Sequence, residues 1–141
     1  MTVETILLPL FVEVGLTFVL MFWMGRLRVG AVTRREVAVP DIALGQPAWP
    51  ARATLVANAY HNQLQLPLLF YVLVILALFT RKADMLFVVL SWMFVTTRLV
   101  HAAVHVTSND IRTRFAAFAA GAVILLIMWI VFALRILFAG L

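Results

Sequence analysis

The chain contains no cysteine and carries few charges of either sign. The absence of cysteine excludes disulfides, thiolate metal sites and a protein thiol nucleophile, so any thiol chemistry needs a thiol brought by a substrate. Charged residues make up 12% of the 141 residues, about half the share of a typical soluble protein, whereas hydrophobic residues make up 65%. A soluble domain of this length has no way to bury so much apolar surface. The expected solvent is therefore a lipid bilayer.

The apolar residues fall into four blocks, each long enough for the helix of about 20 residues that crosses a bilayer. We expect spanning helices at about 5–25, 54–79, 84–106 and 114–138, within a single domain of residues 1–141. In the long connection at 26–53, three prolines and two glycines argue against a continuous helix. The predicted fold class is an all-α integral membrane protein, a bundle of four transmembrane helices.

Basic residues are concentrated near the first and third connections between these blocks. The residues there are Arg26, Arg28, Arg34, Arg35, Arg52, Arg112 and Arg114, and those at the other end are Arg81, Lys82 and Arg135. Because cytoplasmic loops are enriched in lysine and arginine, we expect both connections in the cytoplasm and both termini outside, in a bacterial inner membrane. The arginines flank apolar blocks rather than lining one face, so nucleic acid is not an expected partner.

Polar residues inside two of the spans recur at helical spacing. The residues are Asn58, His61, Asn62 and Gln65 in the second span, and Arg98, His101 and His105 in the third. Each set lies on one helix face, within roughly 15 Å of the cytoplasmic surface at a rise of about 1.5 Å per residue. Polar groups are costly in hydrocarbon and normally face protein or a cavity. Any one of them is explained by helix–helix hydrogen bonding, but together they predict a ligand pocket.

Three further features concern single helices. Glu13 lies within the first span, where an unpaired charge is costly, and we expect it to interact with Arg98 within or between subunits. Such a pair has two interpretations, a structural role and a catalytic role. Pro67 removes the hydrogen bond to the Gln63 carbonyl and is expected to bend the second helix. Small residues near Gly121 would let the fourth helix pack closely against a neighbouring subunit or within its own chain.

Four segments carry a resemblance to a known family. They are Arg52-Ala53, Asn58-Ala-Tyr-His-Asn62, Leu66-Pro67-Leu-Leu-Phe70 and Arg98-Leu-Val-His101-Ala-Ala-Val-His105. With four spans and a long basic first loop, the sequence resembles the MAPEG family, the membrane-associated proteins in eicosanoid and glutathione metabolism, over nearly its whole length. The resemblance implies a homotrimer whose ligand sites lie between adjacent subunits, open to the cytoplasm and to the lipid. Family members include glutathione transferases and glutathione peroxidases.

The resemblance also implies roles for individual residues. Asn58 and Arg98 match glutathione-contacting positions, and either Arg112 or Arg114 matches the catalytic arginine that stabilises the thiolate. The chain departs from the family motif, which has Arg four residues before its Asn and Glu three residues after it, because those positions hold Thr54 and His61. The ligand-binding candidates are Arg52, Asn58, His61, Asn62, Gln65, Arg98, His101 and His105. Gln65 is neutral where some relatives carry an acid.

Three functions compete at this stage. The first is a glutathione-dependent transferase or peroxidase acting on apolar electrophiles or lipid hydroperoxides, with glutathione as co-substrate. Its partners would be further copies of the chain, membrane lipids and hydrophobic small molecules. The second is a non-catalytic scaffold that binds another small anion or a lipid in the same inter-subunit pocket. The third is a haem- or quinone-binding anchor, suggested by His61 and His101. A zinc site is not expected, because Ala102 stands where a zincin has its glutamate.

Overall fold

The computed structural model describes residues 2–45 and 47–138, and every regular element in those ranges is an α-helix. The helices are α1 (Val3–Thr33), α2 (Val39–Ile42), α3 (Ala51–Asn62), α4 (Leu66–Phe79), α5 (Met85–Val106) and α6 (Ile111–Leu137). Four segments are long and apolar enough to cross a membrane, with α3 and α4 together forming the second. The predicted fold class, a four-span helical membrane protein, is confirmed.

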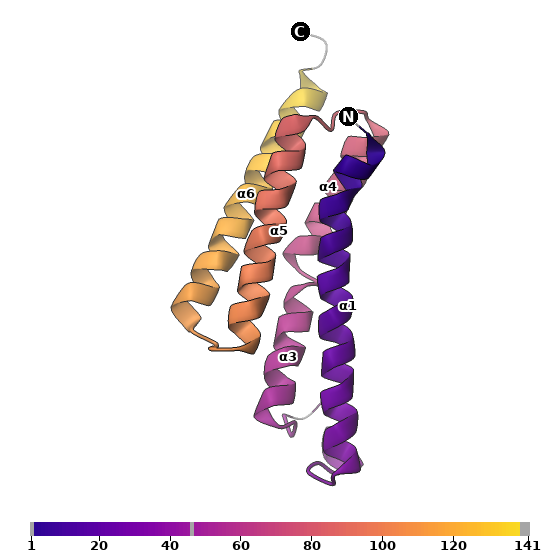
Figure 1. The fold of residues 1–141 in the computed structure, drawn as a ribbon, viewed down its shortest axis with the longest axis vertical. Helices are drawn as coiled ribbons and strands as arrows, with labels where there is room; N and C mark the ends of the chain where they lie inside the picture. Colours follow the sequence, from indigo (N-terminus) through magenta and orange to yellow (C-terminus); the bar gives the residue numbers. More distant parts are fainter. Residues whose placement is uncertain (1, 46, 139–141) are drawn as a thin grey trace.

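The helices run alternately up and down, as Figure 1 shows. Helix α5 packs against α1, α3 and α6, and the second span lies between α1 and the α5–α6 pair. The start of α1 and the end of α6 lie at one end of the bundle, which we call the terminal end. The connections after α1 and α5 lie at the other, which we call the arginine-rich end. This arrangement agrees with the prediction that both termini share one side.

Two aspartates start the last two long helices. The side chain of Asp84 accepts a hydrogen bond from the Phe87 amide at 3.0 Å, and that of Asp110 accepts one from the Thr113 amide at 2.9 Å. Such caps satisfy backbone donors that have no partner inside the helix. The connection before α6 also contains Asn109 at φ 50°, a left-handed conformation that Asn adopts more readily than most residues. Short connections with built-in caps therefore fix α5 between its antiparallel neighbours.

Helix α1 is longer than predicted, because it continues beyond Gly25 to Thr33. A glycine such as Gly30 costs a helix only about 1 kcal/mol, and no proline occurs between it and the helix end. The guanidinium of Arg28 lies 4.9 Å from the centroid of the Trp49 ring, so the following connection folds back onto the extension. In Figure 1 this end of α1 reaches beyond the α5–α6 connection.

The second span is interrupted rather than merely bent. Helix α3 ends at Asn62, and Gln65 has φ −102° and ψ −101°, which is not helical. Pro67 stands in the first turn of α4, where its missing N–H costs nothing. The bend predicted near Pro67 is present, and it is a complete break in the helix. The single helix face expected for Asn58 to Gln65 was wrong at its last member, because the chain leaves the helix before Gln65.

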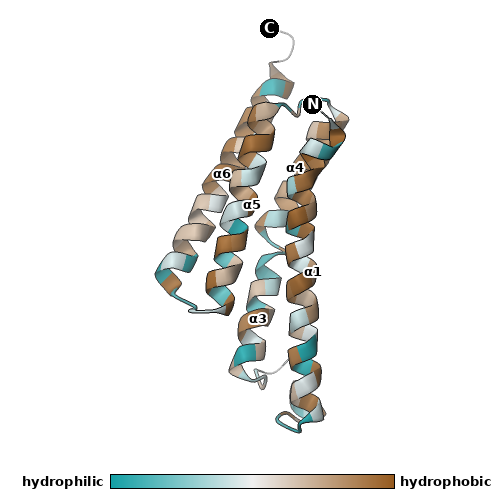
Figure 2. Ribbon diagram, viewed as in Figure 1, coloured by the Kyte–Doolittle hydropathy of each residue, from teal (hydrophilic) through white to brown (hydrophobic). Residues whose placement is uncertain are grey.

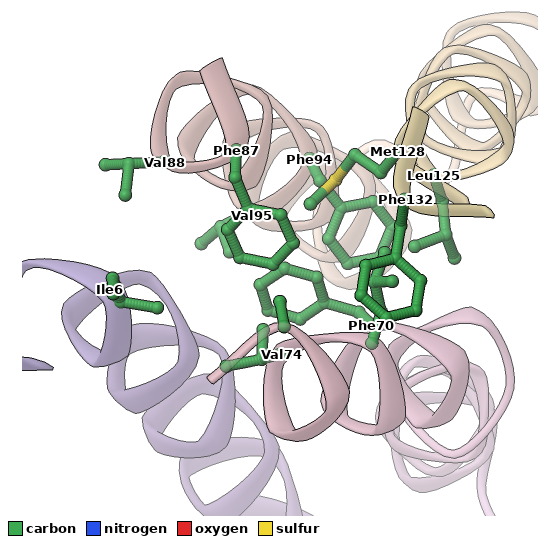
Figure 3. Close-up of a cluster of buried hydrophobic side chains, with 12 residues drawn as sticks. Ile6, Phe70, Val74, Phe87, Val88, Phe94, Val95, Leu125, Met128 and Phe132 are labelled. Carbon is green, nitrogen blue, oxygen red and sulfur yellow. The ribbon is translucent and has the colours of Figure 1, made fainter. Parts of the chain in front are cut away.

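Two apolar clusters hold the bundle together. The larger lies towards the terminal end and includes Phe70 and Phe94, whose ring centroids are 4.8 Å apart. Figure 3 shows side chains of this cluster from α1, α4, α5 and α6 converging on one centre. The smaller cluster lies towards the arginine-rich end and joins Leu20, Val56 and Ala102 on three helices. Close packing within both clusters fixes the positions of the helices.

Candidate functional site

A buried polar layer separates the two apolar clusters. On α1, Glu13 comes between cluster members Ile6 and Leu20, and on α5, Arg98 comes between Val95 and Ala102. Both Glu13 and Arg98 are 0% exposed. Figure 2 shows hydrophilic segments at the junction of α3 and α4 and on the lower half of α5. Ionisable groups at such depth in a membrane protein mark a functional site by default.

Next to this layer lies a cavity of about 290 Å³ between the second span, α5 and α6. Its lining residues are Asn62, Gln65, His101, His105, Ile111, Arg114, Phe115 and Phe118. Polar side chains come from the α3–α4 junction, from α5 and from Arg114, whereas the three apolar ones all belong to α6. The predicted meeting of the two polar stripes is therefore borne out by Asn62, Gln65, His101 and His105. The resulting cavity is amphipathic.

The two histidines form the α5 wall of the cavity. Their ring centroids are 5.6 Å apart and the rings are nearly perpendicular, at 86°. His101 is 3% exposed and His105 4% exposed, and the Nδ1 atom of each is buried without a hydrogen-bond partner among the described residues. Buried polar atoms normally have partners. These two nitrogens are therefore unsatisfied polar atoms in the wall beside the cavity.

The structure distinguishes Arg114 from Arg112, which the sequence could not. Arg114 is half-buried, lines the cavity and donates a hydrogen bond to the side-chain oxygen of Asn109. Its charge also interacts with His101 and His105. Arg112, two residues earlier on the same helix, is exposed and is not part of the cavity wall. Of the two candidate catalytic arginines, only Arg114 is placed to meet a ligand there.

Arg98 lies directly behind the cavity wall. Its Nη2 donates to the Asn62 carbonyl at 3.3 Å, and its guanidinium carbon is 5.9 Å from the centroid of the Phe118 ring. Asn62 and Phe118 both line the cavity. The Nε and Nη1 atoms of Arg98 have no hydrogen-bond partner among the described residues. A second arginine is therefore buried next to the cavity wall without being part of it.

Glu13 is close enough to Arg98 for their charges to interact, as expected from the sequence. The ion pairs found among the described residues do not include these two, and neither carboxylate oxygen of Glu13 has a hydrogen-bond partner. The Tyr71 hydroxyl interacts electrostatically with both groups. The predicted interaction is thus electrostatic, across a polar layer, rather than a direct contact.

Besides Arg98, three predicted ligand-binding residues lie outside the cavity. Arg52 donates to the Val106 carbonyl and lies over the Trp23 ring at 4.9 Å, so it ties α3 to α5 and α1. Asn58 and His61 are exposed on α3, away from the cavity wall. His61 and His101 consequently do not line one cavity within a single chain. Among the described residues no cluster of three or more His, Asp or Glu side chains is arranged to hold a metal ion.

Sequence reasoning missed two polar residues, one buried and one half-buried, and the aromatic wall residues Phe115 and Phe118. Gln63 is fully buried with no partner for either side-chain polar atom, although its position falls outside the predicted stripe. Pro67 could have indicated Gln63, because a break in the helix before this proline changes which residues point inwards. Tyr71, one turn after that proline, was the other. Phe118 lies one turn after Arg114, so the helical spacing from that arginine could have indicated it.

Asn62 and Gln65 are three positions apart, which is the spacing that the family resemblance gives between an asparagine and an acidic residue. Both line the cavity, whereas Asn58 and His61 do not.

Four apolar spans and an amphipathic cavity among them define an integral membrane protein with a candidate ligand site. The model of the MAPEG family matches residues 6–134, and the chain belongs to that family. The comparison with curated proteins found no match, and the comparison with solved structures found none either.

Proposed function

We propose that the protein is a glutathione-dependent transferase or peroxidase whose reaction takes place in the cavity between the second span, α5 and α6. The observation that carries the proposal is the amphipathic lining of that cavity. Arg114, His101 and Asn62 supply donors on one side, and Phe115 and Phe118 supply apolar surface on the other. An anionic thiol and an apolar electrophile or lipid hydroperoxide could meet between these walls.

The chemistry asks little of the protein beyond binding and charge stabilisation. A free thiol has a pKa near 8.5, and a neighbouring arginine favours the nucleophilic thiolate. Arg114 is the group for this task, because its guanidinium is always charged and can donate several hydrogen bonds. Histidine and asparagine side chains then orient the tripeptide, while the apolar wall accepts the second substrate. No protein nucleophile is needed, in keeping with a chain that has no cysteine.

We expect the protein to assemble as a homotrimer in the membrane. The cavity of about 290 Å³ lies at the lower limit of ligand pockets, which span roughly 300–1,000 Å³. Asn58, His61 and Gln65 are exposed on the surface of one chain within a membrane-spanning segment, where polar groups facing lipid are costly. A neighbouring copy would cover them and enlarge the cavity. The positive-inside rule places the arginine-rich end in the cytoplasm of a bacterial inner membrane, where glutathione would enter.

The proposal is tested by titrating glutathione into the detergent-purified, assembled protein by calorimetry. Saturable binding is expected in the unmodified chain and should weaken by at least tenfold in Arg114→Ala, the loss of about 1.4 kcal/mol or more from a charge-assisted hydrogen bond. Arg112→Ala is the matched control, because it removes an equal charge two residues away and outside the cavity wall. Absence of binding, or equal losses in both variants, would reject glutathione as the ligand of this cavity.

A second candidate function follows from Gln65. The cavity wall contains no acidic residue among the described residues, whereas the ammonium group of glutathione would favour one. A scaffold that binds a different small anion or a lipid headgroup would have no need of that acid. Thiol consumption in the presence of a simple electrophile separates the two functions. An enzyme accelerates it, and a scaffold leaves it at the uncatalysed rate.

A further inference from the structure

Arg98 is held away from the cavity although its neighbours line it. It is fully buried, it hydrogen-bonds the backbone of one wall residue, Asn62, and it lies against the ring of another, Phe118. Helical spacing puts it one turn from His101, and the charges of Arg98 and His101 interact. The cavity wall itself contains one arginine, Arg114. The Arg98 guanidinium is therefore a second full positive charge, which lies outside the cavity but next to its wall.

The group that interacts with Arg98 from the opposite side is Glu13. Its carboxylate is fully buried on α1, a helix that contributes no residue to the cavity wall. A buried guanidinium without a counter-charge is strongly disfavoured, and Glu13 is the acidic residue whose charge acts on it. Within residues 2–45 and 47–138, neither Glu13 carboxylate oxygen has a hydrogen-bond partner, and the Nε and Nη1 atoms of Arg98 have none. The two groups are thus paired by charge without being locked together by direct hydrogen bonds.

We propose that the Glu13 carboxylate competes with anionic ligands of the cavity for the Arg98 guanidinium, and thereby sets the affinity of the cavity for anions. In the ligand-free protein, Glu13 is the counter-ion of Arg98. An anion that enters beside His101 and Arg114 attracts the Arg98 guanidinium away from Glu13, and the loss of the Glu13 interaction offsets part of the binding free energy. The inference rests on the same anion site as the proposed function, but it concerns Glu13, which does not touch the ligand.

Inorganic sulfate is the probe, since it needs only positive charge and hydrogen-bond donors. Calorimetric titration of the detergent-purified protein is expected to show sulfate binding about tenfold tighter in Glu13→Gln than in the unmodified chain, within the usual range of coupling between sites. The gain should vanish in the double variant Glu13→Gln/Arg98→Met. Glu4→Gln is the matched control, because it removes a carboxylate from the exposed start of the same helix and should change nothing.

Sulfate affinity that is no tighter in an assembled Glu13→Gln protein would overturn the competition. A gain that persists without Arg98 would also overturn it, because it would reflect only the lost negative charge. If Glu13→Gln fails to assemble, Glu13→Asp decides, since its shorter carboxylate reaches Arg98 less well and should give a smaller gain. Failure of glutathione to bind, with sulfate behaving as stated, would reject the proposed function and leave this inference supported.

Discussion

The two halves of the bundle are built on opposite plans. Towards the terminal end, α4, α5 and α6 meet in a continuous apolar cluster of interlocking aromatic and aliphatic side chains. Towards the arginine-rich end, α5, α6 and the α3–α4 junction surround a cavity beside a layer of buried polar groups, several of which have no partner among the described residues. The boundary falls at the break between α3 and α4. Tight packing fixes the helices in one half, and this allows the other half to keep groups that a stable core would not contain.

The largest expected effect lies in the apolar half. Leu73 is 0% exposed in the larger cluster, and Leu73→Ala should lower the free energy of unfolding by about 3 kcal/mol, because the cavity it leaves forfeits packing contacts. Unfolding of the assembled protein in mixed micelles measures this loss. Leu69→Ala is the control, since Leu69 is exposed on the same helix and should cost less than about 1 kcal/mol. Equal losses would mean that the cluster does not dominate stability.

Within the polar layer, single and paired substitutions should behave differently. Glu13→Gln leaves Arg98 without its counter-charge and should destabilise the protein by about 2 kcal/mol, less than for a directly bonded pair. Glu13→Gln combined with Arg98→Met removes both charges and should return stability close to that of the unmodified chain, or above it. The same unfolding assay completes this double-mutant cycle. Strictly additive losses would show that the two residues do not interact.

The seam between α5 and α6 gives an intermediate effect. A Cβ atom at Gly121 would lie 2.6 Å from Thr97 Oγ1, which already donates to the Phe94 carbonyl at 2.6 Å. Gly121→Ala should therefore cost about 1–2 kcal/mol by forcing the helices apart. Gly15→Ala is the control, because nothing lies within 4 Å of its added methyl group. A neutral Gly121→Ala would indicate that this contact is looser than the structure shows.

The smallest effect is expected at the surface of the terminal end. Arg135 Nη2 donates to Asp84 Oδ2 at 2.6 Å, and this hydrogen bond holds the pKa of the Asp84 carboxyl below its ordinary value of 3.8. A lowered pKa stabilises the fold at higher pH, and the contribution disappears as pH falls through the lowered value. Because the pair is partly exposed, Asp84→Asn should cost only about 0.5 kcal/mol near neutral pH. Thermal unfolding of both proteins should converge in strong acid, and a constant difference would contradict this.

The contrast between the halves also explains what the sequence allowed one to predict. Four spans, their order and the shared side of the termini follow from apolar block length and arginine placement. The meeting of Asn62 with His101 and His105 follows from helical spacing in antiparallel neighbours. Helical spacing could not place Gln65 or the buried Gln63, because both lie in the break between α3 and α4 just before Pro67.

The choice of Arg114 over Arg112 also required three-dimensional information. Residues two positions apart on a helix differ by about 200° around its axis, so the two arginines point in different directions. The sequence alone does not say which of them faces the cavity. For Arg52, in contrast, the sequence suggested a role that its contacts in the structure do not support. Its position at the start of the second span suggested a ligand-binding role, whereas the Val106 carbonyl and the Trp23 ring occupy it.

The most direct test of the account is the ultraviolet absorbance of glutathione thiolate formed on mixing with the assembled protein at neutral pH. If the polar half performs the chemistry and the apolar half only holds it in place, thiolate should form in the unmodified protein and, per folded molecule, in Leu73→Ala. It should be lost in Arg114→Ala, although that variant remains folded. Thiolate formation that survives in Arg114→Ala, or that is absent from the assembled, unmodified protein, would contradict the account.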